Sequence, residues 1–105
     1  MIPEPTVRAT RYEVSCLPEG HIDVHHFTVA VEYRGDGQWA VCRHRQCLGT
    51  DGFWSWESIP SEREDEWIAT HRFSLDEARA LAKDAARKIT CNGLTVADVL
   101  ARDSS

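Results

Sequence analysis

The stretch VAVEYRGDGQWAV, residues 29–41, decides the fold of this chain of 105 residues. Apolar side chains alternate with other residues on both sides of the sequence Gly-Asp-Gly at 35–37, which is typical of a tight turn. With a three-residue loop, large apolar side chains lie opposite each other in two pairs, Tyr33 with Trp39 and Val31 with Val41. A two-residue loop would place Ala40 and Cys42 there instead, which is a poorer match. We therefore predict a β-hairpin with one apolar face.

The sequence before this hairpin predicts a second one. In RYEVSCLPEGHIDVHH, residues 11–26, apolar residues alternate, and LPEGH supplies the Pro and Gly of a turn. We expect strands at about 11–16 and 22–24. The parity of the apolar residues changes at 25–27, and because a strand has a period of two, this change predicts a β-bulge or a strand break. Residues 1–10 contain two prolines and few large apolar groups, so we expect a loose arm there.

Two further strands are expected after the central hairpin. GTDG, 49–52, is a turn signal, and FWSWES after it places Trp54 and Trp56 on one face of a strand. WIATHRF, 67–73, alternates again and predicts another strand. The intervening IPSEREDE, 59–66, is polar and charged, which is typical of an exposed loop or a single helical turn.

The helical signal lies in SLDEARALAKDAARKI, residues 74–89. Ser74 and Glu77 form the S-x-x-E pattern of a capping box. Apolar residues follow at helical spacing and make one stripe, Ala78, Leu81, Ala82, Ala85 and Ile89. Asn92–Gly93 is a stop signal, and TVADVLA after it predicts a short helix capped by Thr95.

Together these patterns predict an α+β fold. We expect an antiparallel sheet of about four to five strands from consecutive hairpins. The sheet packs on one long C-terminal helix at about 75–90, followed by a short last helix at about 96–101. Residues 11–105 are expected to form a single domain after the N-terminal arm, because their number is within the range of one hydrophobic core.

Composition limits the classes of function. The net charge is −5, and this acidic balance disfavours non-specific binding to nucleic acid or to an anionic membrane. No apolar run approaches the ~20 residues of a membrane span, and the first residues lack the apolar core of an export signal. A cytoplasmic location with reduced cysteines is therefore expected.

The sequence CRHRQC, residues 42–47, raises the question of a metal site. If it is one continuous strand, Cys42 and Cys47 point to opposite faces and lie roughly 16 Å apart. One zinc ion cannot then bind both sulfurs. Cys42 and His44 share a face in that reading, and only ligands from a neighbouring strand would complete a site.

A second weak metal candidate is HIDVHH, where His21, Asp23 and His25 share one face of the expected strand. The sequence has no nucleophile elbow, phosphate-binding loop or H-E-x-x-H motif. We therefore expect a protein without enzymatic activity and without a cofactor. Metal binding stays open as an alternative.

The aromatic residues after the 49–52 turn suggest a binding surface. Most aromatic residues are explained by core packing, but GFWSW concentrates three of them in five positions. Trp67 follows the acidic sequence EREDE, which suits docking to a basic partner. We predict that a protein partner binds the aromatic sheet face or the 53–67 segment, with four anchors, Phe53, Trp54, Trp56 and Trp67.

The chain resembles short proteins of high-GC actinobacteria and their phages that have no assigned activity. The resemblance covers most of residues 11–101 and includes EYRGDGQWAVCRHRQCLGTDGFWSWESIPSEREDEWIATHRF and TCNGLTVADVLA. It implies a bacterial or phage cytosolic origin, and an accessory role in a phage or mobile element is part of the expected function. It implies no site residues and no oligomeric state.

A looser similarity is to the sheet-plus-helix DNA-binding domains of plant ethylene-response factors and phage integrase arms. RFSLDEARALAKDAA resembles the strand-to-helix junction of those domains, and WAVCRHR resembles their second strand. The resemblance implies contacts to phosphates or bases from four arginines, Arg34, Arg43, Arg45 and Arg72. The acidic charge and the GFWSWESIPSEREDE insertion depart from that pattern. DNA binding is thus the alternative to a protein partner.

Overall fold

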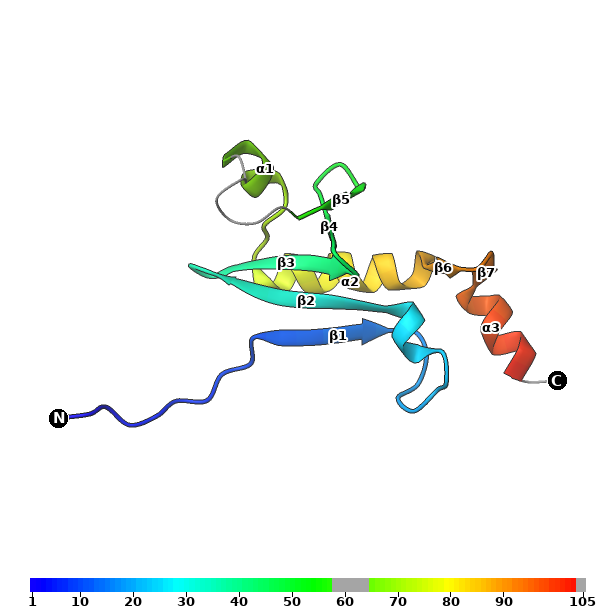
Figure 1. Cartoon of the computed structure of the whole chain (residues 1–105), viewed down its shortest axis with the longest axis horizontal. Helices are drawn as coiled ribbons and strands as arrows, with labels where there is room; N and C mark the ends of the chain where they lie inside the picture. The colour runs from blue at the N-terminus through cyan, green and yellow to red at the C-terminus, as the bar shows by residue number, and fades with distance from the viewer. Residues whose placement is uncertain (58–64, 104–105) are drawn as a thin grey trace.

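The structure is a computed structural model and describes residues 1–57 and 65–103. It confirms the α+β class, with one five-stranded antiparallel sheet, one two-stranded sheet and a long helix (Figure 1). The large sheet contains β1 (Arg11–Ser15), β2 (Thr28–Gly35), β3 (Gln38–Arg43), β4 (Gln46–Leu48) and β5 (Trp54–Trp56). The remaining elements are η1 (Val24–Phe27), α1 (Asp65–Thr70), α2 (Leu75–Lys88), β6 (Thr90–Cys91), β7 (Leu94–Thr95) and α3 (Val96–Asp103).

The five strands of the large sheet follow one another in space in the order β1-β2-β3-β4-β5, and every neighbouring pair is antiparallel. The predicted central hairpin is confirmed, because Tyr33 pairs with Trp39 and Val31 with Val41. The predicted three-residue loop is shorter, because Gly35 pairs with Gln38 and a register shift between Tyr33 and Gly35 accommodates the extra residue. The turn at 49–52 and the strand after it are also confirmed, since β4 and β5 flank that turn.

The predicted hairpin between 11–16 and 22–24 is wrong. β1 pairs with β2, with Tyr12 opposite Val31 and Val14 opposite Val29. Residues 22–24 form no strand; the chain turns there into the 3-10 helix η1, which places Phe27 in the core. The strand break predicted at 25–27 is therefore confirmed. The alternation of Ile22 and Val24 misled the prediction, because Ile22 is exposed.

CRHRQC is a tight hairpin and not one continuous strand. β3 ends at Arg43 and β4 begins at Gln46, so His44 and Arg45 form a two-residue turn. His44 adopts a positive φ of 58°. A residue other than Gly rarely takes this conformation, so the sequence lacks the usual turn signal. The expectation that Cys42 and His44 share a strand face is wrong for the same reason.

The strand predicted at 67–73 is also wrong. Its first residues belong to α1, and Phe73 alone makes a β-bridge, to Trp39. Asp65 and Glu66 lie in the first turn of α1, where acidic residues suit the positive end of a helix, and the Thr70 hydroxyl donates to the carbonyls of Glu66 and Trp67, one turn back. Of the predicted loop 59–66, residues 59–64 lie outside the described residues.

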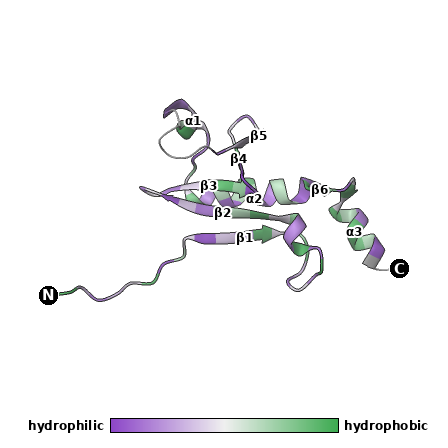
Figure 2. Ribbon diagram, viewed as in Figure 1, coloured by the Kyte–Doolittle hydropathy of each residue, from purple (hydrophilic) through white to green (hydrophobic). Residues whose placement is uncertain are grey.

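The main core lies between α2 and one face of the sheet. The valines of β2 and β3 are fully buried there, and α2 presents Ala78, Ala82 and Ala86 to them. Because alanine is small, the helix axis can approach the sheet closely. The capping box is confirmed, since the Glu77 amide donates to Ser74 Oγ at 3.2 Å. Figure 2 shows that α2 carries both hydrophobic and hydrophilic residues, as an amphipathic helix must.

The chain after α2 forms a small separate sheet and the last helix. Asn92–Gly93, predicted as a stop signal for the long helix, is the turn of the β6–β7 hairpin, with both residues at positive φ. The predicted cap of α3 is confirmed, because the Asp98 amide donates to Thr95 Oγ1 and the Thr95 amide to Asp98 Oδ2. Val99 of α3 is buried in the main core. At the other end of the chain, residues 1–10 are exposed and form no helix or strand.

Candidate functional site

Two cysteine side chains meet on the sheet face opposite α2. Cys42 of β3 and Cys47 of β4 are cross-strand partners, and their Sγ atoms lie 3.4 Å apart, within hydrogen-bonding distance. Both are buried in a second apolar cluster with Ala30 and Ala40, against which Trp67 of α1 packs. The prediction that the two sulfurs lie roughly 16 Å apart on opposite faces is wrong, because it assumed a continuous strand.

An ion-pair network borders the two thiols. Glu57 accepts from Arg34 Nη2 at 2.7 Å and from Arg72 Nη2 at 2.6 Å, so two arginines share one carboxylate. The exposed fraction of the side chain is 3% for Arg72 and 14% for Glu57. Burial alone would raise the pKa of Glu57, but the hydrogen bonds and charges of Arg34 and Arg72 outweigh it and lower the pKa to about 2. Glu57 is therefore ionised at neutral pH.

The network reaches the sulfur atoms through Arg34. Its Nη2 lies 3.6 Å from Cys42 Sγ and donates toward it. The hydrogen bond between the thiols lowers the pKa of Cys47 and raises the pKa of Cys42, since one sulfur accepts the proton that the other donates. The charge of Arg34 lowers the pKa of both. The arrangement thus favours one thiolate shared by the pair.

A cavity of about 250 Å³ gives access to this cluster. It is lined by both sulfur-bearing residues and Glu57, together with the exposed turn residues His44 and Arg45. Within the described part of the chain, the only set of three candidate metal ligands is Cys42, Cys47 and Glu57, whose ligand atoms lie within 4.8 Å of one another. This set fits a cation poorly, because two guanidinium groups already bind the carboxylate.

The metal candidates outside this cluster are not arranged on a strand face. His21 Nδ1 accepts the Asp23 amide at 3.0 Å in the turn before η1. His25 lies in η1, with its ring centroid 3.9 Å from that of His26. The expected shared face of His21, Asp23 and His25 is wrong, because this segment forms no strand.

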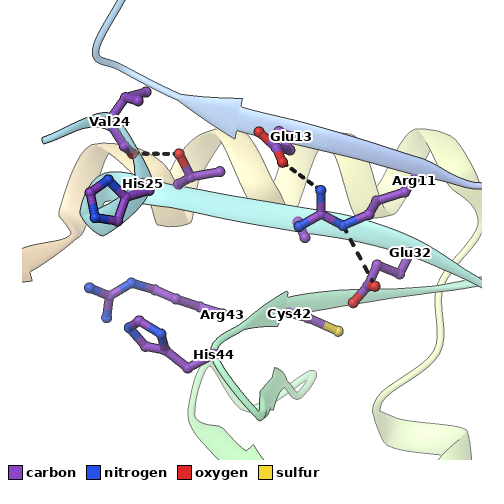
Figure 3. A pocket seen from close by; sticks show the side chains of 10 residues that line it. Arg11, Glu13, Val24, His25, Glu32, Cys42, Arg43 and His44 are labelled. Carbon is purple, nitrogen blue, oxygen red and sulfur yellow. Dashed lines mark hydrogen bonds and ion pairs between the residues drawn. The ribbon is translucent and has the colours of Figure 1, made fainter. Parts of the chain in front are cut away.

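A second cavity, of about 340 Å³, lies on the same sheet face beside Cys42 (Figure 3). Figure 3 shows Arg11 at one end of this pocket between Glu13 and Glu32. The ion-pair distances are 2.5 Å from Arg11 Nη1 to Glu13 and 3.7 Å from Arg11 Nε to Glu32. Arg43, His25 and His44 lie at the other end. The acidic residues already neutralise Arg11, so its charge is not available to a ligand at that end.

Helix α1 is held against the sheet by a histidine. His71 Nδ1 lies 2.7 Å from the Trp67 carbonyl, which can only accept, so Nδ1 carries the proton. In the neutral ring Nε2 then accepts from Ser55 Oγ, which lies 2.9 Å away on β5. The Trp67 ring stacks on the imidazole, with centroids 4.0 Å apart. Gly49 provides the space, because a Cβ there would lie 2.9 Å from His71 Nε2.

The four arginines of the DNA-binding alternative occupy different environments. Arg34 and Arg72 are bound to Glu57, and Arg43 donates to the His26 carbonyl at 3.0 Å. Arg45 is exposed in the two-residue turn. The structure therefore does not present these four side chains as one row on an open sheet face.

The predicted aromatic anchors divide into two groups. Phe53 and Trp56 are exposed, with 73% and 66% of their surface open. Trp54 is half-buried and packs against the main core, and Trp67 is half-buried against the thiol cluster. Trp54 and Trp56 share one side of β5, but the main core covers Trp54 alone.

The backbone of β5 adds to this exposed surface. The Gly49 amide donates to the Phe53 carbonyl, and the Glu57 amide donates to the Arg45 carbonyl. The backbone groups of Phe53, Ser55 and Glu57 therefore face β4. The alternation of an antiparallel pair then directs the N–H and C=O groups of Trp54 and Trp56 away from β4. Among the described residues, β5 ends the sheet on this side.

Comparison with known proteins adds no relative: no family model, no curated protein and no solved structure matches this chain. In the described residues, none of the helices has the length and apolar character needed to cross a lipid bilayer. No local sequence pattern indicated Glu57 as the centre of the ion-pair network. For the pair of thiols the sequence contains a weak signal. A turn at 44–45 would place the apolar residues Val41 and Leu48 opposite each other, and Cys42 opposite Cys47.

Proposed function

We propose that this protein is a non-enzymatic binding module for a protein partner, and that the partner adds an extended segment to the outer edge of β5. The observation that carries the proposal is the exposure of Phe53 and Trp56 on a strand that has no further strand beside it among the described residues. Strand addition supplies main-chain hydrogen bonds, and the exposed aromatic side chains supply contacts that distinguish one partner from another.

The two edges of the sheet differ, and the difference supports β5 as the docking edge. The outer strand at the other side, β1, bears the exposed charged residues Arg11 and Glu13, which discourage strand pairing. β5 bears no charged residue between Trp54 and Trp56. Asp51 and Asp65 are exposed nearby in the sequence, which favours a partner segment with basic residues.

The test is partner binding by the native chain, a double variant Phe53→Ala/Trp56→Ala and the control Ile22→Ala. Ile22 is a large exposed apolar residue outside the sheet, so its removal changes exposed apolar area without touching β5. We expect the partner captured by the native chain to bind Ile22→Ala as tightly as the native chain. The double variant should bind at least tenfold more weakly, because removing an anchor residue costs about 1–4 kcal/mol of binding free energy.

Hydrogen exchange of the complex distinguishes strand addition from side-chain docking alone. The amides of Trp54 and Trp56 point away from β4, so they should become protected only if the partner pairs with this edge. Equal binding by the double variant, with its fold intact by circular dichroism, would contradict the proposal. Binding without new amide protection would contradict strand addition.

The DNA-binding alternative has less support, because Arg34 and Arg72 would have to leave Glu57 before they could contact phosphate. It predicts binding to duplex DNA that weakens steeply with salt. An absence of binding at about 50 mM salt would exclude it, since phosphate contacts are strongest at low ionic strength.

A further inference from the structure

The positions of Cys42 and Cys47 meet the geometric requirements of a disulfide. The two residues flank the last backbone-paired residues of the β3–β4 hairpin, Arg43 and Gln46. The backbone groups of Arg45 and Gly49 bond toward β5, and by the alternation of an antiparallel pair those of Cys47 do so too. The Cys47 backbone therefore does not exchange hydrogen bonds with Cys42 on β3. Cross-strand pairs without hydrogen bonds have a Cα separation of about 4.5 Å, which lies within the range that a disulfide spans. The sulfurs, 3.4 Å apart, need only small side-chain rotations to bond.

The surroundings of the pair favour oxidation chemistry over an inert buried thiol. Arg34 lies 3.6 Å from Cys42 Sγ, and a nearby cation stabilises a thiolate. The cavity of about 250 Å³ contains both cysteines in its lining and reaches the exposed residues His44 and Arg45. A small oxidant can therefore reach the sulfurs, whereas the burial of Cys42 and Cys47 excludes large proteins from them.

We propose that Cys42 and Cys47 are a reversible redox site, which hydrogen peroxide converts into an intramolecular disulfide and a small thiol reduces again. This inference does not depend on the proposed protein partner. The other two cysteines do not share the arrangement: Cys16 is exposed and Cys91 lies in β6 of the small sheet.

The reaction has two steps that balance. One thiolate attacks a peroxide oxygen, the O–O bond breaks, and hydroxide leaves and takes a proton to become water, while the sulfur becomes a sulfenic acid. The second sulfur, as thiolate, attacks the sulfenic sulfur; the S–S bond forms, the S–O bond breaks, and the departing hydroxide becomes a second water. The two thiols lose two electrons and two protons, and one peroxide is reduced to two waters.

Metal binding at the same cluster is the competing interpretation. A divalent cation on Cys42, Cys47 and Glu57 would have to compete with Arg34 and Arg72 for the carboxylate. The same two arginines favour a single added negative charge on sulfur. The cluster thus fits a transient thiolate better than a bound dication.

The experiment treats the reduced full chain with hydrogen peroxide and maps its cysteines after alkylation and trypsin digestion. Trypsin cleaves after Arg43 and Arg45, so a Cys42–Cys47 disulfide joins two peptides that separate on reduction with dithiothreitol. We expect this linked species to form at least tenfold faster than Cys16 is oxidised, and to disappear on reduction. In Cys42→Ser, Cys47 has no sulfur partner, so we expect a sulfenic acid that dimedone traps.

A variant with Cys16→Ser and Cys91→Ser serves as the matched control, because it retains only the proposed pair. It should lose both free thiols together and remain monomeric by non-reducing electrophoresis. The proposal is overturned if peroxide oxidises Cys16 while Cys42 and Cys47 stay reduced, or if the pair passes directly to irreversible sulfinic acid. It is also overturned if added zinc binds stoichiometrically to the pair and prevents disulfide formation.

Discussion

Arg72 donates a hydrogen bond of 2.6 Å to Glu57, and this contact joins the segment after α1 to the end of β5. Arg34 of β2 binds the same carboxylate, so Glu57 connects two segments that are far apart in the sequence. Because the Arg72 guanidinium is almost fully buried, it depends on this carboxylate for its charge partner. The network therefore ties β2, the end of β5 and the segment after α1 together on the sheet face opposite α2.

Replacing Glu57 by glutamine should destabilise the fold strongly. The variant leaves the buried charge of Arg72 without a carboxylate, and removing one partner of a buried ion pair costs about 3 kcal/mol. Urea denaturation measures this loss. The control is Glu13→Gln, whose ion pair with Arg11 is exposed and should contribute less than about 1 kcal/mol. Equal effects of the two substitutions would show that the Glu57 network is not a special source of stability.

The stability of the native chain should depend on pH through Glu57. The pKa of Glu57 is about 2 in the fold and 4.5 ordinarily, so the folded state binds its proton less tightly than the unfolded state. This contribution to stability is complete above the unfolded pKa and is lost as the pH falls through the folded pKa. Thermal unfolding from pH 6 to about pH 2 should show the loss in the native chain, and Glu57→Gln should show a smaller slope. Identical slopes would contradict the assignment to Glu57.

A larger residue at the helix–sheet contact should destabilise the core. Ala82 is fully buried against the valines of the sheet, so Ala82→Leu must separate α2 from the sheet or strain side chains. Such overpacking costs about 1–3 kcal/mol. Ala80→Leu is the matched control, because Ala80 lies on the exposed side of the same helix. Chemical denaturation should show a loss for Ala82→Leu and a change within about 0.5 kcal/mol for Ala80→Leu.

Gly49 should tolerate no side chain. An added Cβ would lie 2.9 Å from His71 Nε2 and 2.9 Å from Asp51 Oδ1, so Gly49→Ala must displace the imidazole from Ser55. We expect a loss of about 1–3 kcal/mol and a changed chemical environment of the His71 ring in NMR spectra. Thr50→Ala, at the exposed neighbouring position, is the control. An unchanged His71 signal in Gly49→Ala would show that the loop moves in place of the ring.

Disulfide formation between Cys42 and Cys47 should stabilise the hairpin only modestly. The cross-link closes a short loop, and loop entropy then predicts a gain of about 2 kcal/mol in the free energy of unfolding. Urea denaturation of the peroxide-treated and the reduced protein gives the difference. A lower stability of the oxidised form would mean that the disulfide distorts the Arg34 contact with Cys42.

The sequence predicted those parts of the fold whose local signals agree with long-range packing. The 35–37 turn has two glycines and flanking apolar pairs, and the caps of α2 and α3 have side chains that satisfy backbone amides. The β3–β4 turn was not predictable in this way, because His44 takes a positive φ although it is not glycine. Because that turn was not predicted, the contact between Cys42 and Cys47 was not predicted either.

The candidate site was predictable only in part. The concentration of aromatic residues after the second turn indicated a binding surface, but periodicity alone did not show that the core covers Trp54 and leaves Trp56 open. Glu57, Arg34 and Arg72 are distant in sequence, and ordinary charged residues carry no local pattern that predicts a shared buried carboxylate. The alternation of apolar and polar residues in 67–73 likewise led to a wrong prediction of a strand. The first residues of that segment belong to helix α1.

The difference between the two edges of the sheet has a consequence for assembly symmetry. Unlimited stacking of sheets needs two usable edges per molecule, so that each copy accepts one neighbour and offers a place for the next. Here the charged residues of β1 oppose pairing, while β5 is the other outer strand in the part of the chain that the structure describes. If strands pair at β5 as proposed, pairing should end after one event, whether a partner segment adds to β5 or two copies meet there about a twofold axis. On the proposed function, we therefore expect a closed complex and no fibre.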